Sequence, residues 1–578
     1  MISQLRNAIE SKEEIHTPFA SELKQHLDKD GGEFLVEVAS DTSTAIDTLI
    51  TFCLPESEHR ACYDVLQRTS EHIGARCSLV VSNPVKSTYL IRRQSRMAED
   101  NIEVRFAVVG NVDAGKSTLL GVLTKGVLDN GRGRARADLF RYKHEIETGR
   151  TSSVGTEVMG FCADGSALIG FSSHDQRRHK ISWEQISNDA AKVVSFIDLA
   201  GHERYLKTTV FGLTSQLPDY VILMVGANAG LVGMSKEHLG LALALGIPVV
   251  VVVSKVDMCP PGILEASLAQ ICKVVQSPGC RKTPVMISSK EDVLSAALRL
   301  PIERICPIFQ VSSVTGHHLD LLSLFMNLIP SSQARYAPLQ SKPVELPVSD
   351  VFNVPFVGTV VSGVLTSGIV KVGDPLLLGP DGLGNFTPTS VRSIHRRRVN
   401  VECASAGQSV CFALKRIRPS QVRKGMLLLS TTDVNPSVHR EFEAEVLCLY
   451  HSTTLSVGSC IVMHASSVRQ TVRIVEIVKS SSPENHHSVS LHANEGFKPI
   501  VRMGDRALVR FQFTCRPEYI TPGTKLIARE GKTKLVGIVS NVGEHGIMPT
   551  SLPEPTRNVA NGPTNPLTRA GMQVRGAA

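Results

Sequence analysis

The sequence predicts a multidomain protein. An α/β domain with a parallel-type sheet is preceded by a small α+β domain and followed by two antiparallel β-barrels. Three observations lead to this fold class. The chain has 578 residues, enough for about four domains of ordinary size. Its middle part alternates nearly all-apolar runs with helical stretches. Its later part carries many short strand-like runs separated by glycine turns.

The composition excludes several classes of protein. Hydrophobic residues make up 42% of the chain and charged residues 20%, which excludes a wholly disordered protein. The longest apolar stretch, 239–253, contains Gly246 and Pro248 and is shorter than the ~20 residues of a membrane-spanning helix. The 13 cysteines are scattered without a C-x-x-C pair, and the first residues show no apolar signal segment. We therefore expect a cytoplasmic protein without membrane association.

The first predicted domain spans residues 1–99. Its mixture of helical and strand-like patterns indicates a small accessory α+β unit, and it carries no chemical signature. Helices are expected over Ile2–Glu14 and Glu58–Ile73, and strands over Phe34–Val38, Ser78–Val81 and Thr88–Arg92.

Five nearly all-apolar runs mark residues 100–330 as the α/β domain. Such runs fit strands that are buried on both faces of a parallel sheet. The helical stretches between them supply the crossover connections. The expected strands are Val104–Val109, Val193–Ile197, Tyr220–Val225, Val249–Val253 and Ile308–Val311.

The remaining chain is predicted to form two barrels and a tail. Short runs rich in Val, Ile and Thr fit one barrel over 340–434 and another over 437–545, joined near Asn435–Pro436. Residues 546–578 contain five prolines and no aromatic residue, which predicts a disordered tail.

A phosphate-binding loop follows the first strand of the α/β domain. The pattern G-x-x-x-x-G-K-S lies between a strand and a helix, as such a loop requires. Its backbone N–H groups and the helix N-terminus can hold a β-phosphate, while Lys116 bridges the β- and γ-phosphates and Ser117 ligates Mg²⁺. The alternative is a chance match in a glycine-rich turn. The expected phosphate-binding residues are Gly110, Asn111, Val112, Asp113, Ala114, Gly115, Lys116, Ser117 and Thr118.

Three further strand ends favour guanine over adenine. Asp198 can hold Mg²⁺ through water, and Gly201 can bring its N–H to the γ-phosphate. Asp257 can accept both N1–H and the exocyclic amine of guanine, a pair that adenine does not offer. Taken singly, Asp198 could cap a helix, and Ser-Lys-x-Asp could be a surface turn; a P-loop ATPase is the weaker alternative. The other expected base-binding residues are Ser254, Lys255, Ser312, Ser313 and Val314.

These motifs carry a family resemblance. The order of the loop, Asp198-Leu199-Ala200-Gly201-His202 and Ser254-Lys255-Val256-Asp257 resembles translational GTPases of the elongation factor Tu and eukaryotic elongation factor one-alpha class. The chain is more closely similar to the eukaryotic family called GTP-binding proteins one and two. The resemblance covers roughly residues 100–545 and includes the barrel segments Gly358–Gly363, Gly368–Asp374 and Arg529–Thr533.

The resemblance implies a mechanism and its cofactors. GTP, GDP and Mg²⁺ are the expected ligands, and hydrolysis yields GDP and phosphate. Thr148–Ser152 becomes the first switch, in which Thr151 ligates Mg²⁺, and His202 orients the attacking water. The implied catalytic set is His202, Lys116, Thr151 and Gly201, and the implied metal set is Ser117, Thr151 and Asp198. The alternative for His202 is an exposed histidine that caps the following helix.

Two residues depart from the family pattern. Ser254 stands where an asparagine is usual, and its shorter side chain offers fewer hydrogen bonds. Arg150 stands where an isoleucine usually forms an apolar gate that shields water from the catalytic histidine. Of that gate only Val112 remains, which puts control of the basal rate in question.

The expected partners follow from the same resemblance. A monomeric elongation-factor-like protein would act with aminoacyl-tRNA on the ribosome, or in ribosome and mRNA quality control. The alternative is an adaptor in RNA decay or signalling, with a structural nucleotide. Asp350–Phe352 matches the segment that holds the aminoacyl end of tRNA, although Phe352 could instead be a core aromatic. Basic clusters that could contact RNA phosphates are Arg132, Arg134, Arg136, Arg141 and Lys143; Arg177, Arg178 and Lys180; and Arg396–Arg398.

Overall fold

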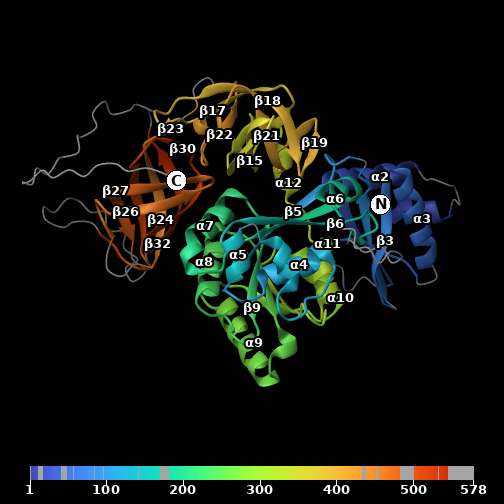
Figure 1. The fold of residues 1–578 in the computed structure, drawn as a ribbon. Helices are drawn as coiled ribbons and strands as arrows, with labels where there is room; N and C mark the ends of the chain where they lie inside the picture. The colour runs from blue at the N-terminus through green and yellow to red at the C-terminus, as the bar shows by residue number, and fades with distance from the viewer. Residues whose placement is uncertain are drawn as a thin grey trace, which may run out of the picture.

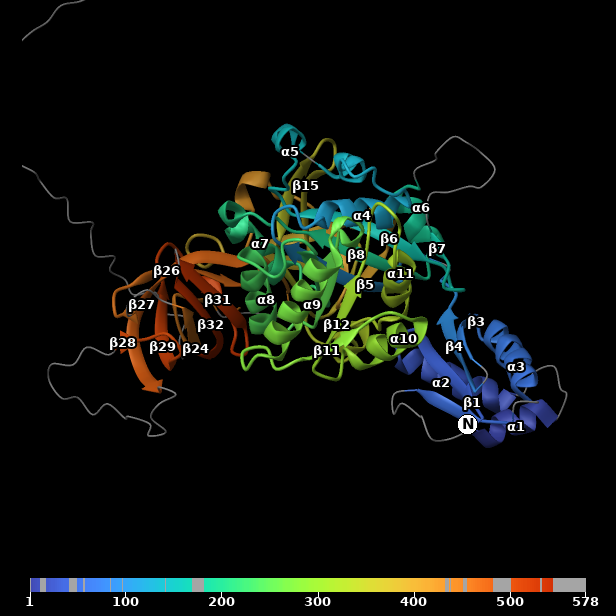
Figure 2. The same cartoon turned by 90° about the horizontal axis from the view of Figure 1, so that it is seen from below.

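The computed structural model describes residues 2–10, 17–40, 49–55, 58–83, 85–95, 97–140, 142–168, 181–431, 436, 438–450, 455–481, 500–530 and 533–543. Figure 1 shows the N-terminal unit in blue, the α/β domain from cyan to green, the first barrel in yellow and the second barrel in orange and red. In Figures 1 and 2 the N-terminal unit and the second barrel lie on opposite sides of the α/β domain. The fold class predicted from the sequence is confirmed.

The N-terminal unit is a four-stranded sheet with three helices. The strand order is β2-β1-β4-β3, and β1 runs parallel to β2 and antiparallel to β4. Helix α2 and strand β2 were not predicted, although Phe19, Leu23 and Leu27 are buried at the four-residue spacing of a helix face. The elements are α1 Ile2–Glu10, α2 Thr17–Lys29, β1 Glu33–Ala39, β2 Ile50–Cys53, α3 His59–His72, β3 Ala75–Ser82 and β4 Lys86–Arg93.

The α/β domain contains an eight-stranded sheet in the order β11-β12-β10-β9-β5-β8-β6-β7. Its strands are β5 Ile102–Gly110, β6 Gly155–Phe161, β7 Ala167–Leu168, β8 Lys192–Asp198, β9 Tyr220–Gly226, β10 Val249–Ser254, β11 Thr283–Met286 and β12 Ile305–Gln310. Its helices are α4 Lys116–Lys125, α5 Lys143–Thr148, α6 Trp183–Asp189, α7 Leu206–Ser215, α8 Met234–Leu245, α9 Pro261–Gln276, α10 Lys290–Arg299 and α11 Leu319–Leu328, with short 3-10 turns η3 Arg134–Leu139, η4 Glu203–Tyr205 and η5 Val256–Met258.

The five predicted strands are confirmed and form the centre of this sheet. The neighbours β12, β10, β9, β5 and β8 all run parallel. The prediction of a parallel-type sheet is wrong at one edge, because β6 runs antiparallel to β8 and β7 antiparallel to β6. The chain enters β6 from the switch segment and runs straight along the edge of β8, so no crossover helix is needed.

Alternate residues of β5 enter the two cores of the α/β domain. Val104, Phe106 and Val108 lie in the core that also contains residues of α4, α10 and α11. Ala107 and Val109 lie in the core that contains residues of α7, α8 and α9. Because strand side chains alternate between faces, the apolar run from Phe106 to Val109 covers both faces of the strand. The carboxyl end of this fully buried strand is where the phosphate-binding loop begins.

The first barrel is joined to the α/β domain by α12 Gln333–Tyr336 and η6 Ala337–Leu339. Its main sheet follows the order β13-β22-β17-β18-β21-β15-β14. The chain passes directly from β13, at one end of this order, to β14, at the other end, through Val348 and Ser349. The elements are β13 Glu345–Pro347, β14 Asp350–Val354, β15 Gly358–Val364, β16 Ile369–Lys371, β17 Pro375–Gly379, β18 Thr387–Arg396, β19 Val399–Val401, β20 Cys403–Ser405, β21 Ser409–Leu414, η7 Pro419–Gln421 and β22 Leu427–Ser430.

The second barrel is a closed ring of six strands, β24-β29-β27-β26-β31-β32. Alternation of buried and exposed residues, seen over Glu441–Tyr450, directs one face of each strand into the barrel core. The elements are β23 Val438–His439, β24 Glu441–Tyr450, β25 Leu455–Ser456, β26 Cys460–Ala465, β27 Val468–Ser481, β28 Ile500–Val501, β29 Arg506–Phe513, β30 Glu518–Tyr519, β31 Lys525–Glu530 and β32 Thr533–Val542.

A buried ion cluster joins the N-terminal unit to the α/β domain. The carboxylate of Glu33 accepts hydrogen bonds from Arg92 Nε at 2.8 Å and from Lys192 Nζ at 2.5 Å. Lys192 also donates to the carbonyl oxygens of Asn327 and Ile329, at 2.8 and 2.6 Å. These bonds compensate the buried ammonium group, whose pKa is lowered to about 8 by burial.

A second buried cluster joins the α/β domain to the first barrel. Glu103 of β5 lies 3.4 Å from Arg396 Nη2 and 2.9 Å from Arg397 Nη2. Beside it, Arg105 donates to the carbonyl oxygen of Gly407 in the barrel at 2.9 Å. Burial alone would raise the pKa of Glu103, but the charges of Arg397, Arg396 and Arg105 lower it to about 2. The carboxylate is therefore ionised inside the interface.

The prediction that Arg396–Arg398 contact RNA is contradicted for Arg396 and Arg397, which pair with the buried Glu103, and stays a prediction for the exposed Arg398. Arg396 and Arg397 are used inside the interface. The guanidinium of Arg398 lies 4.7 Å from the ring centroid of Trp183 in α6, a cation–π contact at the rim of the same interface.

The second barrel contacts the α/β domain through more exposed charges. Glu237 of α8 pairs with Arg529 at 3.0 Å and with Lys534 at 2.5 Å. Lys525 Nζ donates to the carbonyl oxygen of Leu245 at the end of α8, at 2.6 Å. These side chains are more exposed than the charged side chains at the first barrel.

Some predictions fall outside the described residues. They concern the last residues of the helix Ile2–Glu14, the basic residues Arg141, Arg177, Arg178 and Lys180, the domain join at Asn435, Gly531 and Lys532 of the third-domain segment, and the tail 546–578. Among the helices that the structure describes, none is both long and apolar enough to cross a membrane.

Candidate nucleotide-binding site

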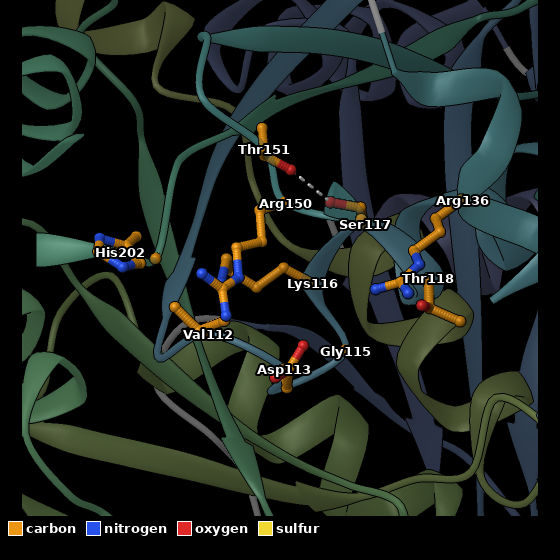
Figure 3. A pocket seen from close by; sticks show the side chains of 12 residues that line it. Val112, Asp113, Gly115, Lys116, Ser117, Thr118, Arg136, Arg150, Thr151 and His202 are labelled. Atoms are coloured by element: carbon orange, nitrogen blue, oxygen red, sulfur yellow. Dashed lines mark hydrogen bonds between the residues drawn. The ribbon is translucent and has the colours of Figure 1, made fainter. Parts of the chain in front are cut away.

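The residues predicted to bind a nucleotide converge at one edge of the central sheet. Strands β5, β8, β10 and β12 are parallel neighbours or next neighbours, so their carboxyl ends meet there. Figure 3 shows the pocket at this edge, with side chains from the phosphate-binding loop, the switch segment and the turn after β8. It is lined by Val112, Asp113, Gly115, Lys116, Ser117, Thr118, Arg136, Gly149, Arg150, Thr151, Gly201 and His202.

Two side chains of α8 hold the beginning of the phosphate-binding loop. The N–H of Gly110 donates to His238 Nδ1 at 3.2 Å, and the N–H of Asn111 donates to Ser235 Oγ at 3.1 Å. Burial lowers the pKa of His238 to about 3, so its imidazole is neutral and can accept a hydrogen bond. Gly110 has φ +148°, and a Cβ there would lie 2.3 Å from the carbonyl oxygen of Met224. The sequence analysis missed Ser235 and His238, which belong to the polar run Ser235–His238 in the first turns of α8 and show no local signal of this role.

Lys116 is the cation of the loop. Its buried ammonium donates to the carbonyl oxygens of Asn111 at 2.7 Å and Gly110 at 3.2 Å. Burial lowers its pKa to about 8, against the opposing charges of Asp198 and Asp113. A Cβ on Gly201 would lie 2.6 Å from the backbone carbonyl oxygen of Gly110, so only glycine allows the turn after β8 to approach the loop this closely.

Three predicted metal ligands meet beside the lysine. Ser117 Oγ donates to Asp198 Oδ2 at 2.7 Å and lies 3.0 Å from Thr151 Oγ1. Thr151 Oγ1 lies 3.5 Å from the same carboxylate oxygen. Asp198 Oδ1 is buried without a hydrogen-bond partner among the described residues, and burial raises the pKa of this carboxyl. Two hydroxyls and a carboxylate with a free oxygen are hard oxygen donors, so the set fits Mg²⁺.

A buried carboxylate positions the switch segment. Glu145 of α5 is 1% exposed, and its Oε1 accepts hydrogen bonds from both the N–H and the hydroxyl of Ser152 at 2.7 Å. The same oxygen accepts from the N–H and the hydroxyl of Ser153 at 3.1 Å. The sequence analysis did not identify Glu145, because a single glutamate in a short helix has no distinguishing local pattern.

His202 lies at the pocket but caps a helical turn. Its Nδ1 accepts a hydrogen bond from the N–H of Arg204 at 3.1 Å, at the start of η4. Figure 3 shows its ring directed away from Val112 and Lys116. This is the arrangement that the capping alternative describes. The catalytic role of His202 stays a prediction, and it requires the ring to rotate toward the loop.

The base-binding side of the site is more open. Ser254 is 3% exposed, and its hydroxyl donates to the carbonyl oxygen of Ala114 at 2.8 Å, so it ties β10 to the phosphate-binding loop. Ser312 Oγ accepts from the N–H groups of Val314 and Thr315, at 3.2 and 3.1 Å, and shapes the turn after β12. Asp257 is exposed in η5 and is free to meet a ligand from solvent.

The basic residues near the site divide into two groups. Arg132, Arg134 and Lys143 are exposed, as a contact with RNA would require. Arg136 instead lines the nucleotide pocket. Its guanidinium packs closely against Gly133 and Gly149, so that a Cβ on either glycine would crowd it.

Comparisons with known proteins agree with this geometry. The model of the elongation factor Tu GTP binding domain matches residues 102–331, and that of elongation factor Tu domain 2 matches residues 358–429. A solved bacterial selenocysteine-specific elongation factor EF-Sec has TM-score 0.52 and 20% identity, over 76% of this chain and 58% of that one. The factor SelB from Methanococcus maripaludis, solved with the GTP analogue GppNHp, has TM-score 0.52 and 17% identity over 77% of this chain and 80% of its own.

The fold and the site define a translation-factor-type GTPase. GTP-binding protein 1 of Xenopus laevis is 50% identical over 455 residues, covering 78% of this chain and 65% of that protein's length. GTP-binding protein 2 of Mus musculus is 40% identical over 533 residues, covering 90% of this chain and 83% of that protein. The chain belongs to the family of GTP-binding proteins 1 and 2. The resemblance inferred from the sequence is thereby confirmed.

Proposed function

We propose that this GTPase binds GTP with Mg²⁺ at the described pocket and acts with the ribosome and aminoacyl-tRNA. The observation that supports it most is the meeting of Lys116, Ser117, Thr151 and Asp198 at the loop, because these groups come from three separate segments. The division into an accessory domain 1–99, a GTP-binding domain 100–330, barrels 340–434 and 437–545 and a tail 546–578 belongs to the same proposal.

The chain's own groups then have defined roles. The loop from Gly110 to Thr118 binds the phosphates through those N–H groups that the side chains of α8 do not hold, and Lys116 neutralises charge on the β- and γ-oxygens. Ser117, Thr151 and Asp198 hold Mg²⁺, which supplies further neutralisation of the triphosphate when bound. Gly201 brings its N–H close to the γ-phosphate. Thr151 holds the switch segment beside Ser117 and Asp198, where the segment would respond to the presence of the γ-phosphate.

Asp257 selects the base in this proposal, with Lys255 covering the ring and Ser312, Ser313 and Val314 at the guanine O6. An Asp257→Asn variant tests the assignment, because xanthine carries a carbonyl where guanine carries its exocyclic amine. We expect the variant to lose affinity for GTP and to gain affinity for XTP in a fluorescent-nucleotide competition assay. Retained preference for GTP over XTP would show that another residue reads the base.

The first barrel supports the proposed tRNA partner. Phe352 on β14 is 47% exposed, so the alternative that it is a core aromatic is wrong. An exposed aromatic side chain beside the exposed Val354 can stack on a terminal base or pack on an aminoacyl side chain. Co-sedimentation with ribosomes and a non-hydrolysable GTP analogue, with and without aminoacyl-tRNA, tests this role. We expect aminoacyl-tRNA to increase binding and Phe352→Ala to remove the increase.

The alternative function is a cytoplasmic adaptor in RNA decay or signalling, with a structural nucleotide. The orientation of His202 favours it, because a ring that caps η4 is not directed toward the phosphate-binding loop. Affinity capture with GTP and with GDP separates the two functions. Ribosomes captured only with GTP support the translation role, and partners that are indifferent to the nucleotide support the adaptor.

A further inference from the structure

Arg150 is an arginine of the nucleotide pocket whose side chain has no partner among the residues that the structure describes. It lines the pocket together with Lys116, Val112 and His202. No hydrogen bond or ion pair of its side chain to another described residue is present. Figure 3 shows the Arg150 and Lys116 side chains both directed into the pocket, toward the loop that carries Val112 and Asp113. Its guanidinium is therefore available to a ligand bound on that loop.

The backbone around Arg150 is held on both sides. Thr151 is tied to Ser117 at 3.0 Å through its hydroxyl. Ser152 and Ser153 are tied to the buried carboxylate of Glu145 by four hydrogen bonds of 2.7 to 3.1 Å. On the other side, the N–H of Gly149 donates to the carbonyl oxygen of Glu145 at 2.8 Å. The segment thus presents the arginine from a fixed backbone, which lowers the reorganisation needed when a ligand binds.

The chemistry at this place calls for a planar cation. In phosphoryl transfer the developing charge spreads over the γ-phosphoryl oxygens, and catalysis consists mainly of positioning and charge stabilisation. A guanidinium donates two parallel hydrogen bonds to such oxygens. Lys116 is a single point charge whose ammonium is already shared with two loop carbonyls. An arginine on the switch segment can supply the two parallel hydrogen bonds to the γ-phosphoryl oxygens that the lysine does not supply.

We propose that Arg150 is a catalytic residue supplied in cis, whose guanidinium binds the γ-phosphoryl oxygens in the transition state of GTP hydrolysis. A water oxygen forms a bond to the γ-phosphorus, the bond from that phosphorus to the β–γ bridging oxygen breaks, and the proton of water passes to the phosphate product. Arg150 stays protonated throughout. Glu145 is a positioning residue that holds the segment. The inference rests on the proposed nucleotide site.

The test is single-turnover GTP hydrolysis without ribosomes. Arginines supplied in this way contribute roughly 10³–10⁵-fold to the rate. We expect Arg150→Ala to slow hydrolysis at least about 100-fold, with an unchanged Kd for GDP. Arg150→Lys should remain impaired, because an ammonium cannot make the bidentate contact. Arg304→Ala is the matched control, an exposed arginine just before β12, at the opposite edge of the sheet; its rate should equal that of the wild type.

A second readout isolates the transition state. GDP with aluminium fluoride imitates the transferring phosphoryl group, so the wild type should form this complex without a partner and Arg150→Ala should not. Glu145→Ala should weaken this complex while leaving GDP affinity unchanged, and Glu145→Gln, which retains an oxygen acceptor, should restore part of it. A general structural defect would lower GDP affinity as well.

The outcomes separate the inference from the site on which it rests. If the wild type fails to bind GDP or GTP, the proposed site is wrong and the inference falls with it. If the wild type binds nucleotide but Arg150→Ala hydrolyses GTP at the wild-type rate, or still forms the aluminium fluoride complex, the inference alone is overturned. Wild-type protein that binds GDP but never forms that complex without ribosomes would also overturn it.

Discussion

The α/β domain holds its two barrels by ion pairs of different kinds. At the first barrel Glu103, Arg396 and Arg397 have side chains that are at most 5% exposed. At the second barrel the side chains of Glu237, Arg529 and Lys534 are 12 to 27% exposed. Buried charges are costly to separate because each loses its only compensation, whereas exposed pairs exchange their partner for water. The comparison suggests that the contact with the second barrel is the easier one to open.

Removal of Glu103 should have the largest effect. Glu103→Ala leaves Arg396 and Arg397 buried without their anion, and breaking a buried pair in this way costs about 3–5 kcal/mol. We expect this loss in the free energy of unfolding, measured by denaturant titration of the full chain. Glu303→Gln, which alters an exposed pair with Arg299, should leave the midpoint unchanged. A loss below about 1 kcal/mol at Glu103 would contradict the strong first interface.

Acid should weaken the same interface in a defined range. The pKa of Glu103 is about 2 in the folded protein and 4.5 in its ordinary state. A lowered folded pKa adds stability that is fully present above pH 4.5 and is lost as pH falls toward 2. Acid unfolding of the wild type should therefore show a slope over this range that Glu103→Gln reduces. An equal dependence of stability on pH in both proteins would mean that a group other than Glu103 causes the acid unfolding.

Removal of Glu237 should have a smaller effect that salt can imitate. Glu237→Gln weakens the pairs with Arg529 and Lys534, and partly exposed pairs contribute about 0.2–1 kcal/mol each. We expect faster hydrogen exchange in β31 and β32, with the first barrel unaffected. High salt should produce the same change in the wild type by screening. A loss as large as that for Glu103→Ala would remove the difference between the two interfaces.

The contact of Arg398 with Trp183 at the rim of the first interface should contribute least to the free energy of unfolding. Arg398 lies over Trp183 at an exposed position, where a cation–π contact contributes about 0.5 kcal/mol. Arg398→Ala should lower the unfolding midpoint only slightly in thermal denaturation, and Arg398→Lys should restore part of the loss. An effect of several kcal/mol would mean that the rim, and not the buried cluster, stabilises this contact.

Local sequence signals predicted the parts of the site that are contiguous in the chain. The phosphate-binding loop and the ends of β8, β10 and β12 each follow a recognisable apolar strand, so their order and place were predictable. The residues that support the loop were not. Ser235 and His238 act on it from 124 and 128 residues away, and nothing in their neighbourhood shows that their acceptors face two backbone N–H groups.

The switch segment shows the same division. The departure at Arg150 was visible in the sequence, where it meant only the loss of an apolar gate. The structure shows that the Arg150 side chain lines the pocket. The segment that carries it is held by the hydrogen bond of Thr151 to Ser117 and by the Glu145 carboxylate of α5, and the sequence does not reveal either contact.

The sequence by itself determined that this chain carries a guanine-nucleotide site of the translation-factor type, because glycine spacing and strand ends are local patterns with a direct chemical meaning. Only the tertiary structure decided which charges are buried together. Glu103 and Arg396 are 293 residues apart, and their pairing depends on how one domain packs against another. Such long-range contacts have no local pattern, since the energy that favours them exists only once both surfaces have folded.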